Sequence, residues 1–123
     1  MIGEIRDKET AKIAIEASLT GHLVVSTIHA KDSVNCLYRF MDLGVSIEEL
    51  RQTVVGIVAQ TLFQSPVIQE ERHALFEILS DVQLQMAITA IMQKTSYELP
   101  HDLTLAGQKE MIESHHYANT NVY

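Results

Sequence analysis

Residues 20–30 read T-G-H-L-V-V-S-T-I-H-A, and the fold class of the chain can be argued outward from them. Leu23, Val24, Val25 and Ile28 form a nearly continuous apolar run in which β-branched side chains are frequent. A short run of this kind after a Thr-Gly turn signal is typical of a strand covered on both faces, as in a parallel sheet. We therefore predict a buried strand between the two histidines of this stretch.

A helix is predicted immediately before this strand, over residues 8–19. Asp7 is placed to cap its first turn, and Gly21 lies just past its end, where a glycine commonly terminates a helix. The residues before Asp7 read M-I-G-E-I-R, in which two apolar residues run into a glycine and a carboxylate as at the end of a buried strand. The order strand, helix, strand predicts a parallel pair of strands.

Helical patterns dominate the next part of the chain. Residues 33–43 carry apolar side chains spaced for one helix face, and Gly44 is a suitable stop. Ser46 and Glu49 form an S-x-x-E capping box. The apolar residues that follow this box predict one long helix over residues 47–63.

The rest of the chain predicts one late strand and two helices. The segment R-H-A-L-F-E-I-L at residues 72–79 alternates as a strand does, helices are predicted over residues 82–92 and about 103–113, and residues 114–123 are expected to fray. Strands that alternate with helices define an α/β fold. The helices carry more apolar surface than these few strands can cover, which indicates that the fold is incomplete.

The composition limits the class of protein. The chain has 123 residues, of which 46% are hydrophobic, so it has one domain's length and enough apolar side chains for a core. Its 9 Lys and Arg against 16 Asp and Glu give a net charge of -7, which argues against direct nucleic-acid binding. No apolar run approaches the roughly 18–20 residues of a membrane span. The single Cys36 allows no internal disulfide.

Glu4 is the first candidate for chemistry. At the carboxyl end of the first strand it would lie at the edge where open α/β sheets bind ligands. A carboxylate there can orient a water molecule for attack or hold Mg²⁺ through water, whereas a solvated carboxylate in a turn is the structural alternative. Arg6 is expected to form a surface or inter-element ion pair.

His22 and His29 stand at opposite ends of the second predicted strand. Seven residues at about 3.3 Å each place them roughly 23 Å apart if the segment is extended, so they cannot bind one metal ion together. His29 would share the sheet edge with Glu4 and could hydrogen-bond a phosphate oxygen. His22 would lie at the opposite end, where it would tether the helix terminus or touch a neighbour. For each histidine a purely structural role is the alternative.

Taken together, these segments carry a family resemblance. G-E-I-R-D-K-E-T at residues 3–10 and T-G-H-L-V-V-S-T-I-H-A at residues 20–30 resemble the Walker B box and the histidine box of the type II secretion and type IV pilus ATPase superfamily. Residues 41–60, from M-D-L-G-V through V-V-G-I-V-A-Q, and F-E-I-L at residues 76–79 are similar to its assembly branch. Within that branch the chain most resembles the ATPases of Gram-positive competence pseudopili.

The resemblance implies an incomplete RecA-like P-loop ATPase core followed by a mostly helical C-terminal region. It divides the chain into a core remnant (1–32), a helical region with one late strand (33–95) and a tail with a short helix (96–123). In that family, homo-hexamers hydrolyse ATP to power type IV pilus-like assembly for DNA uptake or type II secretion. They are cytoplasmic and dock on an inner-membrane platform protein, without a membrane span of their own.

The resemblance also implies roles for individual residues. Glu4 takes the Walker B position, in water activation or in Mg²⁺ coordination through water. His29 is expected near the γ-phosphate, and His22 and Arg6 in supporting or subunit-interface positions. ATP and Mg²⁺ are the implied ligands, and no zinc site is implied because the paired cysteines common in relatives are absent from this sequence.

Besides the missing cysteines, two features depart from the family pattern. The phosphate-binding Walker A loop, G-x-x-x-x-G-K-[ST], does not occur in these 123 residues, and Gln60-Thr61-Leu62 stands where many relatives have Gln-Arg-Leu. The loop is expected upstream, so the chain by itself is expected to bind ATP poorly. The alternative hypothesis is a non-catalytic interaction module that docks on full-length subunits or on the pilus machine.

Overall fold

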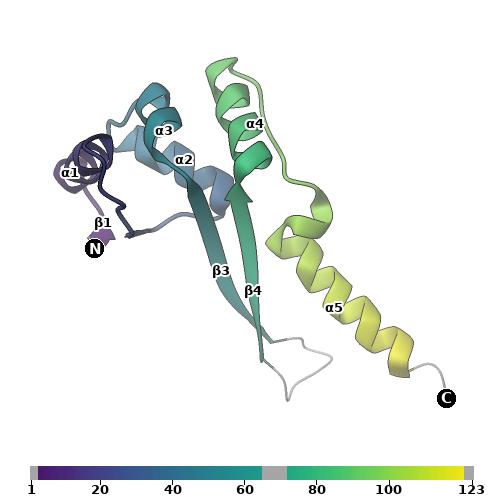
Figure 1. The fold of residues 1–123 in the computed structure, drawn as a ribbon. Coiled ribbons are helices and arrows are strands. Elements are labelled where there is room, and N and C mark those ends of the chain that lie inside the picture. Colours follow the sequence, from purple (N-terminus) through teal and green to yellow (C-terminus); the bar gives the residue numbers. More distant parts are fainter. Residues whose placement is uncertain (1–2, 65–71, 121–123) are drawn as a thin grey trace.

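The computed structural model describes residues 3–64 and 72–120, except for the side chains of residues 115–120. The strands of these ranges form two separate two-stranded sheets. Figure 1 shows a long hairpin with helices gathered around one of its ends, while the last helix begins beside its second strand and slants away from it. The elements in chain order are β1 (Glu4–Ile5), α1 (Lys8–Leu19), β2 (Thr27–Ile28), α2 (Ser33–Asp42), α3 (Ile47–Thr53), β3 (Gly56–Gln64), β4 (Arg72–Ser80), α4 (Asp81–Met92), the 3₁₀ turn η1 (His101–Leu103) and α5 (Leu105–Thr120).

The first sheet, β1 with β2, is parallel and very short. Glu4 pairs with Thr27 and Ile5 with Ile28. The helix α1 connects the two strands, as a parallel pair requires a crossover. The predicted strand, helix, strand order is therefore confirmed.

The predicted buried strand between His22 and His29 is wrong in its extent. Only Thr27 and Ile28 form β2, and Leu23 and Val25 are 82% and 58% exposed. Among the described residues β2 has β1 as its one neighbour, so the sheet supplies no layer that could cover both of its faces.

Local capping bonds determine where α1 and α2 begin and end. The Thr10 N–H donates to Asp7 Oδ1 at 2.8 Å, and the Asn35 N–H donates to Asp32 Oδ1 at the same distance. After α2, Gly44 adopts a φ of +90°, a left-handed conformation that glycine tolerates best. The helix predicted at residues 8–19 is confirmed in both bounds, and α2 is one residue shorter than expected.

The capping box of Ser46 and Glu49 forms as predicted, but the helix it opens is short. The Glu49 N–H donates to Ser46 Oγ, and the Ser46 N–H donates to Glu49 Oε1, both at 3.1 Å. The long helix predicted over residues 47–63 is wrong beyond Thr53, because β3 occupies Gly56–Gln64. Gly56 is unfavourable inside a helix, and the β-branched residues on both sides of Gly56 favour a strand.

The second sheet is an antiparallel hairpin of two nine-residue strands. Its register runs from the pair Gly56–Ser80 to the pair Gln64–Arg72. The strand predicted at residues 72–79 is confirmed as β4, which is one residue longer. The expectation of one late strand in the C-terminal region is corrected to two strands, since β3 takes the place of a predicted helix.

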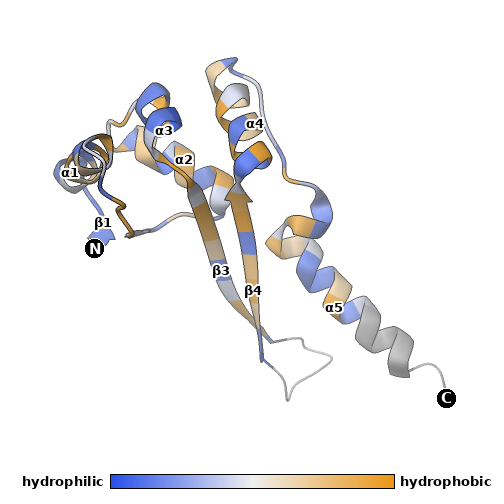
Figure 2. Ribbon diagram, viewed as in Figure 1, coloured by the Kyte–Doolittle hydropathy of each residue, from blue (hydrophilic) through white to orange (hydrophobic). Residues whose placement is uncertain are grey.

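The two faces of the hairpin have different surroundings. Along β4 every second residue is buried, namely Leu75, Glu77 and Leu79, and α2 and α5 pack on the hairpin at this inner face. The alternate residues of both strands form an outer face that remains exposed. Apolar residues run along both strands in Figure 2, and the exposed large ones on this outer face are Val58, Leu62, Phe76 and Ile78.

A single apolar core joins α1, α2, α3 and α4 to the end of β4. Cys36 of α2 belongs to the buried residues, and burial raises the pKa of its thiol to about 11. The largest core side chains with almost no exposure are those of Leu37, Leu50, Leu79, Leu84 and Ile88.

The C-terminal elements are longer than the sequence predicted. The helix predicted over residues 82–92 is confirmed as α4, which begins one residue earlier. The short helix predicted over residues 103–113 is corrected to α5, which runs from Leu105 to Thr120, so the backbone of residues 114–120 is helical instead of frayed. Residues 121–123 lie outside the described residues. No helix in the described ranges has the length and apolar character needed to span a bilayer.

Candidate functional site

The backbone places Glu4 and the residue that follows β2 near one edge of the parallel sheet, although Glu4 is the first of the two residues of β1 and not, as the sequence predicted, its last. Glu4 lies directly opposite Thr27, and His29 is two residues further along the chain. Since parallel strands point the same way, the carboxyl ends of β1 and β2 meet at a shared edge. Two residues of extended chain advance about 6.6 Å, a separation that long side chains can bridge around one small ligand. The roles of both residues toward a nucleotide stay predictions.

Glu4 is accessible and only weakly engaged. Its Oε2 lies 3.4 Å from Arg6 Nε, and the two side chains are 46% and 79% exposed. This is the surface ion pair expected for Arg6. Exposed pairs of this kind contribute at most about 1 kcal/mol, so the Arg6 side chain can leave the carboxylate without a large cost.

The Gly3 carbonyl joins the two strands next to the candidate residues. Ser26 Oγ, Thr27 Oγ1 and the Thr27 backbone N–H all lie 3.1 Å from the Gly3 oxygen, to which each can donate. Three donors on one acceptor explain how a sheet of two-residue strands keeps its register. The two hydroxyls therefore hold the backbone at the start of β1 in place. Neither the Walker B box nor the histidine box predicted this structural role.

His22 lies away from the carboxyl-end edge and contacts the end of α1. Its Nδ1 lies 3.1 Å from Thr20 Oγ1 and 3.3 Å from the Ala17 carbonyl oxygen, and its backbone N–H donates to the same oxygen at 3.2 Å. These contacts confirm the tether to the helix terminus that the sequence predicted as one role for His22. Its supporting role toward a nucleotide site stays a prediction.

The described residues contain no cluster of three or more His, Cys, Asp and Glu side chains that could hold a metal ion alone. Glu4 offers a single exposed carboxylate. Mg²⁺ commonly takes one or two carboxylates and completes its shell with water and substrate phosphates. The donor set at Glu4 thus fits Mg²⁺ only when phosphate oxygens supply further ligands.

Glu77 is a functional candidate that sequence reasoning missed. It is 4% exposed within β4 and accepts hydrogen bonds from two helices. Its Oε1 accepts from the backbone N–H of Ser33 at 3.0 Å and from Ser33 Oγ, and its Oε2 accepts from the Leu105 N–H at 3.1 Å. A glutamate on the buried face of an apolar strand is the one signal in the sequence that could have identified it.

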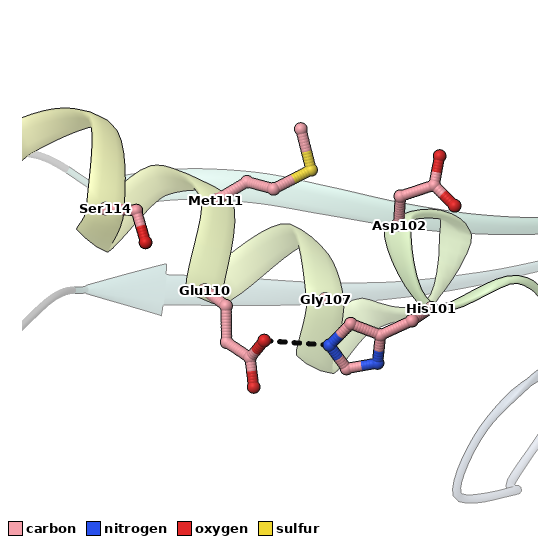
Figure 3. Close-up of a pocket in the computed structure, with 6 residues that line it drawn as sticks. All are labelled: His101, Asp102, Gly107, Glu110, Met111 and Ser114. Carbon is pink, nitrogen blue, oxygen red and sulfur yellow. Dashed lines mark hydrogen bonds and ion pairs between the residues drawn. The ribbon is translucent and has the colours of Figure 1, made fainter.

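A shallow groove lies at the other end of the chain, between η1 and α5. Figure 3 shows His101 facing Glu110 across it, with His101 Nε2 2.8 Å from Glu110 Oε2, while Asp102 points away from this pair. Both side chains of the pair are about two-thirds exposed. A methyl group on Gly107 would lie 1.7 Å from the His101 carbonyl oxygen, so only glycine fits there. The groove contains none of the predicted site residues; its lining is His101, Asp102, Gly107, Glu110, Met111 and Ser114.

Comparison of the sequence with known proteins gives consistent matches. The family model described as "Type II/IV secretion system protein" matches residues 1–120. Competence protein ComGA of Halalkalibacterium halodurans is 41% identical over 105 residues, which cover 73% of this chain and 30% of that protein. Type II secretion system protein HxcR of Pseudomonas aeruginosa is 53% identical over 62 residues, which cover 50% of this chain and 13% of that protein.

Comparison of the fold with solved structures agrees. The X-ray structure of the Yersinia pseudotuberculosis ATPase DotB matches with a TM-score of 0.62 at 32% identity, over 76% of this chain and 26% of that one. The Legionella pneumophila ATPase DotB matches with a TM-score of 0.61 at 25% identity, over 91% of this chain and 34% of that one. The chain thus spans about a third or less of these relatives.

Proposed function

The chain belongs to the type II/IV secretion system protein family, and we propose that it carries the Walker B and histidine boxes of a motor ATPase of that family. ATP hydrolysis by the complete assembly would power pseudopilus or type IV pilus-like assembly, for competence DNA uptake or for type II secretion. The resemblance that residues 3–10 and 20–30 predicted is confirmed by the family match and by relatives named as a competence protein and as secretion system proteins. Solved structures titled as ATPases support the assignment to a mixed α/β ATPase fold.

In this proposal the carboxyl-end edge of β1 and β2 faces the nucleotide. Glu4 orients the attacking water or holds Mg²⁺ through water, and His29 donates a hydrogen bond to the γ-phosphate. Arg6 releases Glu4 from its exposed ion pair, and His22 supports the site by fixing the end of α1 ahead of β2. The observation that carries the proposal is the parallel register of Glu4 with Thr27, two residues before His29.

The same proposal requires parts beyond these residues. The G-x-x-x-x-G-K-[ST] loop that cradles phosphates is absent from this sequence, so a complete RecA-like core needs it from elsewhere in the polypeptide. Mg²⁺, when bound, neutralises charge on the phosphates. We propose a homo-hexamer that works in the cytoplasm and meets the membrane through an inner-membrane platform protein, without binding nucleic acid directly.

The test uses the longest product of the reading frame that contains these residues. Glu4→Gln should lower ATP turnover by about 10²- to 10⁴-fold, the usual contribution of a general base, and leave the affinity for a fluorescent ATP analogue unchanged. Glu9→Gln is the matched control, because Glu9 is exposed in the first turn of α1 and should have no effect on turnover. Turnover that survives Glu4→Gln would remove Glu4 from the catalytic role.

A non-catalytic interaction module remains the second candidate, because one observation favours it. The outer face of the hairpin exposes Val58, Leu62, Phe76 and Ile78, which are between 47% and 67% exposed. Contiguous exposed apolar side chains are typical of surfaces that another protein covers. Such a module would dock on full-length ATPase subunits or on the pilus machine.

The sequence upstream of Met1 discriminates between the two candidates. A continuous reading frame with a G-x-x-x-x-G-K-[ST] loop supports the ATPase, whereas a ribosome-binding site directly before Met1 and no nearby loop supports the module. A binding assay adds a second criterion. If the 123-residue chain binds a full-length relative without nucleotide, and Leu62→Gln with Ile78→Gln abolishes that binding, the module is favoured.

A further inference from the structure

We propose that Glu77 couples the C-terminal helix α5 to the segment that carries His29. The carboxylate lies on the inner face of the hairpin and is 4% exposed. One of its oxygens accepts a hydrogen bond from the start of α2, and the other accepts one from the start of α5. Its two partners lie 44 and 28 residues away in the sequence, so the bonds are tertiary contacts.

Helix geometry explains why a carboxylate occupies this position. The first N–H groups of a helix have no partner within the helix, and their dipoles favour negative charge. Ser33 is the first residue of α2, and Leu105 is the first residue of α5. Glu77 thus satisfies one unpaired N–H of each helix with a charged acceptor, which forms stronger bonds than a neutral one does.

The α2 side of this contact connects directly to the candidate site. Ser33 is fully buried and gives Glu77 both its backbone N–H and its hydroxyl proton. Only residues 30–32 separate Ser33 from His29, and Asp32 among them is fixed as the N-cap of α2. A shift of the Ser33 end of α2 therefore moves the backbone on which His29 stands.

The α5 side has a second tether that does not involve Glu77. Gln108 Nε2 donates to the Phe76 carbonyl oxygen at 2.7 Å and to the Leu103 carbonyl oxygen at 3.1 Å. Removal of this amide loosens α5 and leaves the carboxylate itself unchanged. Substitution of Gln108 can therefore perturb α5 without a change to the Glu77 side chain.

Because both bonds share one carboxylate, loss of one changes the charge density available to the other. Coupling of this kind is reciprocal: a change at α5 must affect the start of α2, and a change at Ser33 must affect α5 by the same free energy. Glu77 acts as a positioning residue in this scheme. The structural coupling itself does not depend on the proposed function. Only its consequence for ATP, a shift of His29 relative to a bound phosphate when α5 moves, rests on the proposed function.

The experiment measures amide hydrogen exchange and His29 ring NMR signals in the nucleotide-free 123-residue chain. Gln108→Ala should raise exchange in the first turn of α5 by about fivefold, the effect of one hydrogen bond, and should also raise exchange at Ser33 and shift the His29 signals. Ser33→Ala should raise exchange in the first turn of α5. Gln85→Ala, the same truncation at an exposed position of α4, is the control and should change neither segment.

Replacement of Glu77 decides whether the carboxylate carries the effect. In a Glu77→Gln background, Gln108→Ala should no longer change Ser33 or His29, because one amide oxygen cannot serve both helices. If this background fails to fold, Glu77→Asp is used, since its shorter side chain can reach only one helix start. The proposal is overturned if Gln108→Ala loosens α5 alone, or if transmission to His29 persists without the Glu77 carboxylate. Because no nucleotide is present, failure to bind ATP would leave this result standing and would count only against the proposed function.

Discussion

The two sheets of this molecule differ in the length of their strands, in strand direction and in what packs against them. The β1–β2 pair has two residues in each strand, runs parallel and needs the crossover helix α1 to connect them. The β3–β4 pair has nine residues in each strand, runs antiparallel and carries two helices on one face. The short sheet combines the exposed Glu4 with the buried Ile5, whereas the long one buries Leu75, Glu77 and Leu79 on its inner face.

This difference separates stability from the candidate chemistry. Leu79 of β4 is fully buried, whereas Glu4 of β1 and Leu23 just before β2 are exposed. Most of the large side chains with almost no exposure lie on helices, namely Leu37, Leu50, Leu84 and Ile88, and the hairpin adds Leu75 and Leu79. Most of the hydrophobic free energy therefore comes from the helices and the inner face of the hairpin. The parallel pair buries Ile5 in the core but leaves the side chain of Glu4 exposed, so that carboxylate can reach a ligand.

The largest expected effect tests where the stability resides. Leu79→Ala removes a side chain with no exposed surface and should lower the free energy of unfolding by about 2–5 kcal/mol. Leu23→Ala, next to the short sheet, should change it by less than about 0.5 kcal/mol because Leu23 is exposed. Urea denaturation followed by circular dichroism measures both, and equal losses would abolish the contrast between the sheets.

The second prediction concerns the two histidines on either side of β2. In the complete ATPase, His29→Ala should reduce ATP turnover by roughly 10- to 150-fold, the value of a hydrogen bond of about 1.5–3 kcal/mol to a charged group. His22→Ala should instead lower the free energy of unfolding by about 1 kcal/mol, because its contacts are with the end of α1. Steady-state kinetics and denaturation separate the two, and a greater turnover loss in His22→Ala would reverse the assignment.

A third, smaller effect is expected at the capping box that leads into the hairpin. Ser46→Ala removes the acceptor for the Glu49 N–H and should lower the free energy of unfolding by about 1 kcal/mol. Ser96→Ala, at an exposed position outside helices and strands, is the matched control and should have no measurable effect. Thermal melting of the three chains checks the prediction.

The smallest effect is a pH dependence next to the short sheet. The pKa of Asp7 is lowered below its ordinary value of 3.8, mainly because its carboxylate accepts a hydrogen bond from the Thr10 backbone N–H. A lowered folded-state pKa means that the stabilisation is present above pH 3.8 and is lost as the pH falls through the folded-state value. Asp7→Asn keeps a cap without a charge, so its melting temperature relative to the unchanged chain should rise as the solution is acidified below that pH.

The sequence predicted the helix starts well because their signals are local. Asp7 and the Ser46–Glu49 pair act within one helical turn, so the residue types alone indicate the cap. The strand β3 was missed because a capping box followed by an apolar run fits a helix up to Gly56, and the choice of a hairpin depends on pairing with β4, up to 24 residues away. The β-branched residues flanking Gly56 were the available warning.

The candidate site, too, could be predicted from the sequence only in part. The shared edge of Glu4 and His29 follows from the strand, helix, strand order, which the sequence shows, whereas their chemical roles rest on the family. The Glu77 contact could not be predicted, because it requires Ser33 and Leu105 to arrive from two distant helices at one carboxylate.

Gly107 limits how the last part of the chain can move. The backbone of α5 passes so close to the His101 carbonyl that no side-chain atom fits between them. The turn η1 and the first turn of α5 are thereby in direct backbone contact, and Thr104 between them hydrogen-bonds to both His101 and Gly107. A displacement of the C-terminal end of α5 would therefore turn the helix about this contact. Leu105, whose N–H donates to Glu77 of β4, lies close to that pivot point.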